Sequence, residues 1–97
     1  MSIQEIVEIV RSYLGDGGAT LKRHHGPQAA TAAQDLVALL KAGLQEESVY
    51  ASLWEQFESE PEQTATELAG ALEALAEADP ALARRMEAFL EEYRRAV

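Results

Sequence analysis

The stretch SEPEQTATELAGALEALAEADPALARRMEAFLEEYRRAV, residues 59–97, decides the fold class because it contains two helix starts in succession. Ser59 and Glu62 are spaced as a capping box with Pro61 between them, and Asp79 is a candidate N-cap directly before Pro80. Apolar residues recur at helical spacing after each start: Ala65, Leu68, Ala69, Leu72, Leu75 and Ala76, then Leu82, Met86, Phe89, Leu90, Tyr93 and Val97. The stretch therefore predicts two consecutive helices.

The preceding 58 residues carry signals of the same kind. Ser2 and Glu5 form another capping box, which predicts a helix from near Ile3, and Gly15 is placed to end it in the left-handed conformation. Further helical segments are expected from about Pro27 to Ala42 with Gly43 as the stop signal, from Gln45 to near Ser59, and as a candidate short turn over Ala19 to His25.

No alternating β-branched run and no Asn-Gly turn competes with these helices, so the sequence predicts an all-α fold. The short connections favour a compact antiparallel bundle of five helices, or six with the candidate turn, formed by residues 1–97 as one domain. The expected core is Ile3, Ile6, Val10, Leu36, Leu40, Leu53, Trp54, Phe57, Leu68, Leu72, Leu75, Met86, Phe89, Leu90 and Tyr93, with alanines allowing close helix packing.

Composition narrows the classes of function. The chain has no cysteine, which excludes disulfides and thiolate metal sites, and no apolar run near the roughly 18 residues of a membrane span. Its first ten residues, MSIQEIVEIV, lack the pattern of a signal peptide because two glutamates interrupt them. We expect a cytoplasmic protein without a membrane partner.

The net charge of −9 is unevenly distributed. Four acidic and four basic residues balance over residues 1–45, whereas residues 46–79 hold ten acidic residues and no Lys or Arg. Because phosphate binding needs clustered cations, nucleic acid is not expected as a partner.

The segment GDGGATLKRHHGPQ, residues 15–28, holds four of the six glycines and both histidines. It lacks the spacing and the preceding strand of a phosphate-binding or dinucleotide-binding loop, so no such cofactor is expected. Adjacent His24 and His25 do not have the i, i+4 spacing of a helical metal site, so no metal is expected either. No serine or threonine has a recognisable activating partner, and we expect a non-catalytic protein, with a small enzyme that uses either histidine as the less favoured reading.

Two charged surfaces and one aromatic cluster are the candidate partner-binding sites. The basic patch is Lys22, Arg23, His24 and His25, and the acidic face is Glu46, Glu47, Glu55 and Glu58. These surfaces could meet within one molecule or between two, and a contact between two different surfaces of identical chains builds rings or filaments. Tyr50, Trp54 and Phe57 are either aromatic anchors for a partner or large core side chains, and the core reading is favoured because alanine-rich helices otherwise lack bulk.

Residues 49–93 resemble an all-helical module of bacterial multi-domain and conflict-system proteins. The matching residues are Leu53, Trp54, Phe57, Pro61, Asp79, Pro80 and Leu90. The resemblance implies an adaptor or effector-associated interaction domain. We therefore predict a protein–protein interaction module whose partner is another protein or a second copy. The alternative is a small acidic regulator, similar to an antitoxin, that occupies a basic site on another protein.

Overall fold

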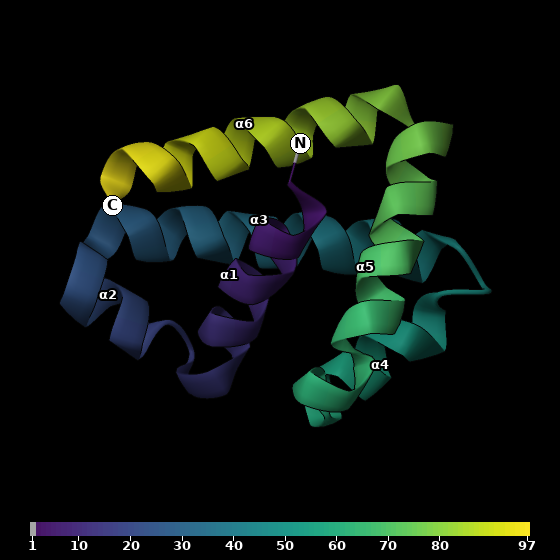
Figure 1. Cartoon of the computed structure of the whole chain (residues 1–97), viewed down its shortest axis with the longest axis horizontal. Coiled ribbons are helices and arrows are strands. Elements are labelled where there is room, and N and C mark those ends of the chain that lie inside the picture. The colour runs from purple at the N-terminus through teal and green to yellow at the C-terminus, as the bar shows by residue number, and fades with distance from the viewer. Residues whose placement is uncertain (1) are drawn as a thin grey trace.

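The computed structural model describes residues 2–97, and these residues form helices with no strand. The helices are α1 (Ile3–Asp16), α2 (Ala19–His25), α3 (Pro27–Glu46), α4 (Ala51–Ser59), α5 (Pro61–Ala78) and α6 (Pro80–Ala96) (Figure 1). The predicted all-α class is thus confirmed, and the candidate turn over residues 19–25 is a helix that brings the number within residues 2–97 to six. None of the described helices has the length and hydropathy needed to span a membrane.

The longest helix, α3, lies at the centre of the fold and packs against α1, α2, α4 and α6. α6 runs antiparallel to α3, with Ala96 beside Pro27 at one end and Leu82 beside Gly43 at the other. By contrast, α1 and α5 run across the direction of α3 in Figure 1. The helices therefore do not form one uniformly antiparallel bundle, because the short helices α2 and α4 turn the chain between the longer ones.

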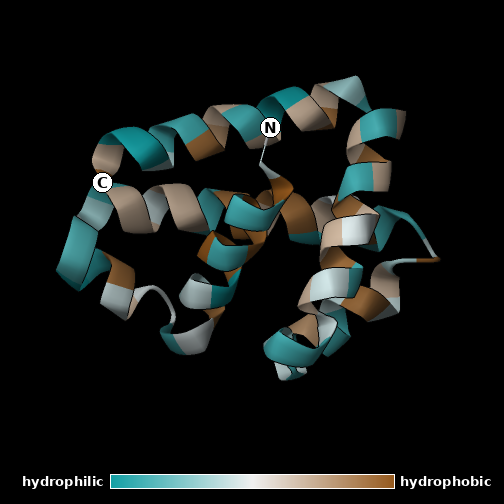
Figure 2. Cartoon of the chain, in the orientation of Figure 1, coloured by the Kyte–Doolittle hydropathy of each residue, from teal (hydrophilic) through white to brown (hydrophobic). Residues whose placement is uncertain are grey.

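The core forms where the apolar faces of the helices meet, and Figure 2 shows hydrophobic residues gathered where α1 crosses α3. Trp54 and Phe57 are fully buried, as are Ile6, Leu36 and Met86. Twelve of the fifteen predicted core residues are buried. The remaining three, Leu53, Phe89 and Tyr93, are only half-buried and pack against the edge of the core.

The turn between α1 and α2 corrects the prediction for the end of the first helix. Gly15 remains helical, and Gly17 takes the left-handed conformation at φ 68°. Gly18 follows at φ 87°, directly beneath the Tyr13 ring, where an added Cβ would lie 2.7 Å from Tyr13 Cε2. Asp16 accepts hydrogen bonds from the backbone N–H groups of Gly18 and Thr20 and from the Thr20 hydroxyl. Only glycine, which lacks a Cβ, suits both the positive φ and the closely packed Tyr13 ring at position 18.

Two other sequence signals do not act as predicted. Gly43 does not stop α3, which continues to Glu46, because the next residue, Leu44, is fully buried and its burial outweighs the roughly 1 kcal/mol cost of a helical glycine. Residues 47–50 then form a turn, so α4 begins at Ala51 instead of Gln45.

Ser59 is the last residue of α4 and does not cap α5. The predicted Asp79 cap is confirmed, because its carboxylate accepts from the N–H groups of Ala81 and Leu82, each at 3.1 Å.

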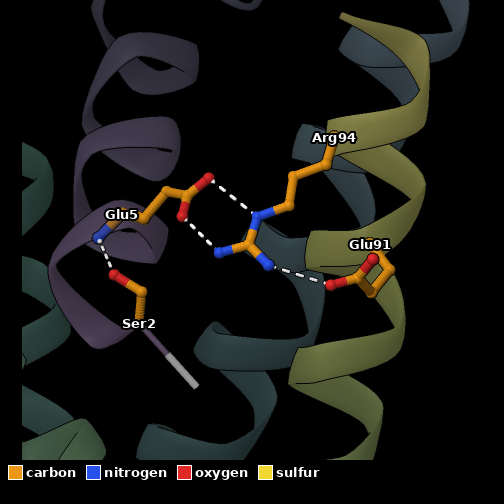
Figure 3. Close-up of polar contacts among 4 residues, drawn as sticks. All are labelled: Ser2, Glu5, Glu91 and Arg94. Atoms are coloured by element: carbon orange, nitrogen blue, oxygen red, sulfur yellow. Dashed lines mark hydrogen bonds and ion pairs between the residues drawn. The ribbon is translucent and has the colours of Figure 1, made fainter.

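The capping box at the N-terminus is only half formed. The Ser2 hydroxyl accepts from the Glu5 N–H at 3.4 Å, but the Glu5 carboxylate turns toward α6 (Figure 3). There it accepts two hydrogen bonds from Arg94, at 3.1 and 2.6 Å, while Arg94 also donates to Glu91 at 2.9 Å. Hydrogen bonding from Arg94 holds the pKa of Glu5 below its ordinary value, although burial acts in the opposite direction. The ion pair links the first helix to the last.

Candidate interaction surfaces

The predicted basic patch is the outer surface of α2. This helix buries one residue, Leu21, and exposes Lys22, Arg23, His24 and His25. The ion pairs within residues 2–97 join Arg11 to Glu8 and Arg94 to Glu5 and Glu91, so neither cation of the patch has a carboxylate partner in the described chain. Arg23 donates to the Thr20 hydroxyl, which in turn donates to Asp16, so the patch is a cationic surface without a direct ion pair.

The two histidines border a hollow of about 280 Å³ between α1, α2 and α6, together with Glu8, Ser12 and Tyr93. The His25 and Tyr93 rings meet edge to face, with centroids 6.3 Å apart. Burial raises the pKa of Tyr93, and the charge of Glu5 raises it further, so the phenol keeps its proton at neutral pH. Across residues 2–97 no hydrogen bond joins Ser12 to a histidine, and no three His, Asp or Glu side chains are grouped to hold a metal ion.

The predicted acidic face extends from the far end of α3 along α4, and the residues that follow α4, Pro61 and Glu62, share a hollow with Asp16 and Thr20. Glu46 ends α3, Glu47 lies in the following turn, and Glu55 and Glu58 are on α4. All four are exposed, as are the other acidic residues between positions 46 and 79. No ion pair involves any of these residues within the described chain.

Glu46 and Glu47, which we call the acidic end, are separated from the basic patch by the length of α3. The patch precedes its first residue and Glu46 is its last, and a helix of 20 residues is about 30 Å long. Figure 1 shows α2 and the end of α3 at opposite ends of the long axis. The length of α3 therefore prevents an ion pair between α2 and Glu46 within one molecule.

The aromatic cluster belongs to the core. Trp54 and Phe57 are 0% exposed, with ring centroids 5.9 Å apart, and Tyr50 is half-buried. Anchoring a partner requires an exposed ring, so the anchor reading is wrong for Trp54 and Phe57. The exposed apolar side chain here is Val49, at 78%. It is exposed because residues 47–50 form a turn.

Sequence reasoning missed one feature, a hollow of about 390 Å³ where α3 ends and α5 passes into α6. Leu39, Leu75 and Leu82 contribute its apolar lining, and Glu46, Glu47, Asp79 and Arg85 its charged groups. We call it the acidic hollow. The sequence identifies Asp79 only as a cap, since no local pattern reveals that the α5–α6 connection packs beside the end of α3.

No protein-family model, curated protein or solved structure matches this chain.

Proposed function

We propose that this protein is a non-catalytic interaction module that associates with itself through its two oppositely charged ends. The supporting observation is that the basic patch on α2 and the acidic residues around Glu46 lie at opposite ends of α3, with no ion pair between them. Because α3 keeps Glu46 away from α2, these opposite charges are available for a contact between two molecules.

Contact between two different ends is heterologous. Each added molecule offers a fresh basic patch and a fresh acidic end, so association continues until a ring closes or a filament forms. An adaptor role of the kind implied by the resemblance of residues 49–93 agrees with such an assembly, because adaptor modules act by bringing chains together.

A second candidate function follows from the excess of negative charge. All ten acidic residues between positions 46 and 79 are exposed, whereas the basic patch offers two permanent cations, Lys22 and Arg23. One copy of α2 therefore neutralises only part of the acidic surface. This imbalance favours a regulator that binds a basic site on a different protein, with a strong dependence on salt.

Light scattering over a range of protein and salt concentrations tests the proposal. We expect a mass that rises above that of one chain with protein concentration and falls when salt is added. Lys22→Glu with Arg23→Glu should return the protein to one chain. Lys41→Glu with Arg84→Glu makes the same change of net charge at exposed sites outside the patch and should not. A protein that remains one chain at low salt would rule out self-association and leave the acidic regulator.

A further inference from the structure

The acidic hollow combines an apolar floor with a negative rim. Leu39 and Leu75 are nearly buried beneath it, at 7% and 8% exposure, and Leu82 is half-buried. Small residues, Ala42 and Ala78, keep the hollow open. Apolar surface left in a concave position is available for a side chain from another molecule.

The charged groups of the hollow do not cancel. Glu46, Glu47 and Asp79 stand against one cation, Arg85, and none of these four groups forms an ion pair within residues 2–97. One carboxylate oxygen of Asp79 caps α6 by accepting hydrogen bonds from two backbone N–H groups. The rim therefore keeps an excess of negative charge.

An apolar floor with a carboxylate rim is complementary to a long cationic side chain. Lys and Arg place their methylene stems on apolar surface while their charged heads remain in a polar environment. A purely apolar side chain would fill the floor but leave the carboxylates without a partner. The hollow thus selects a basic segment.

We propose that the occupant is α2 of a second copy, with Lys22 and Arg23 extended over the leucines and their charged heads at Glu46 and Glu47. This inference rests on the proposed self-association and identifies the surface that accepts the patch. Other cations fit less well: Arg84 and Arg95 lie on α6 among its glutamates, whereas α2 carries no acidic residue and stands at one end of the molecule (Figure 1).

Filling the hollow without changing charge tests the proposal. Ala42 lines the hollow and is exposed, so Ala42→Phe should narrow the floor while leaving the monomer folded. We expect association to weaken by about tenfold or more, equivalent to about 1.4 kcal/mol. Ala38→Phe, at an exposed position one turn earlier on α3, is the matched control and should have no such effect. Equal association for both variants would overturn the docking site.

Charge exchange provides the second measurement. Glu46→Lys with Glu47→Lys should abolish association, whereas Glu67→Lys with Glu73→Lys, the same charge change elsewhere, should not. When the Lys22→Glu, Arg23→Glu variant is mixed with the Glu46→Lys, Glu47→Lys variant, both contacts are again complementary and association should return.

The two proposals fail in different ways. Association that needs Lys22 and Arg23 but is unchanged by Ala42→Phe and by reversal at Glu46 and Glu47 would preserve self-association and overturn the hollow. A wild-type protein that never associates would overturn both.

Discussion

The two ends of α3 are built differently. At the α2 end, Asp16 organises the preceding turn through three hydrogen bonds, and Gly18 fits beneath Tyr13. At the other end, the turn over residues 47–50 has backbone hydrogen bonds, exposes Val49, and leads into α4, which has no side-chain cap. Trp54 is fully buried beneath that end, and its Nε1 has no hydrogen-bond partner.

The difference shows that two kinds of force fix the ends. Short-range polar contacts and backbone angles define the α1–α2 turn, so its structure depends on small residues of particular types. Burial of Trp54 and Phe57 holds α4, so the second end depends on large side chains and leaves its polar surface free.

The largest change in stability is expected at the end that is held by burial. Trp54→Ala removes the largest fully buried side chain, and we expect the free energy of unfolding to fall by about 3–5 kcal/mol. Val49→Ala, at an exposed neighbouring position, should change it by less than about 0.5 kcal/mol. Urea unfolding followed by circular dichroism measures both. Similar values for the two variants would show that burial does not hold α4.

The next test concerns the end held by backbone geometry. Gly18→Ala introduces a left-handed alanine and a clash with the Tyr13 ring, and should destabilise by about 2–4 kcal/mol. Gly15→Ala is the matched control: Gly15 is helical with open space around it, so alanine should stabilise by about 0.5–1 kcal/mol. Thermal unfolding gives the sign of each change, and a neutral Gly18→Ala would contradict the geometry of the turn.

A smaller effect distinguishes real caps from sequence signals. Asp79→Ala removes two hydrogen bonds at the start of α6 and should cost about 1 kcal/mol. Ser59→Ala should stay within about 0.5 kcal/mol, since Ser59 makes no cap contact with α5. Urea midpoints compare the two variants. An equal loss of stability in both would show that Ser59 does cap α5.

The smallest expected effect is that of the pair between Glu5 and Arg94. Because Arg94 lowers the folded-state pKa of Glu5, the pair stabilises the fold at neutral pH, and this contribution is lost as pH falls through that pKa. Glu5→Gln should therefore be less stable than wild type at pH 7, and the difference should shrink as the pH falls below the ordinary glutamate pKa of about 4.3. Both side chains are more than a third exposed, at 37% and 44%, so salt should also reduce the difference. A gap that is independent of pH would contradict the pairing.

The sequence predicts the helices well because their signals are local. Pro27, Pro61 and Pro80 each begin a helix, and apolar spacing identifies most of the core. The errors occur where a distant contact decides. Gly43 has the local properties of a stop signal, but Leu44 is buried against other helices, and Glu5 has the spacing of a capping residue but pairs with Arg94, 89 positions away.

For the candidate surfaces, the sequence identifies charge but not position. Charged side chains are usually exposed, so the sequence alone predicts exposure for the residues of both surfaces: Lys22 to His25, and Glu46, Glu47, Glu55 and Glu58. Their separation depends on α3 being one uninterrupted helix, and the acidic hollow depends on α5, α6 and α3 meeting, which no local pattern encodes.

The length of α3 has a consequence for binding at both ends at once. Fields from exposed charges decay over about 8 Å at physiological ionic strength, and the ends of a 20-residue helix are about 30 Å apart. An occupant at one end therefore leaves the electrostatic potential at the other nearly unchanged. At about 10 mM salt the screening length grows to about 30 Å, and the two ends become coupled. For the proposed self-association we therefore expect two independent contacts in physiological salt, so that the strength of one contact does not depend on whether the other has formed.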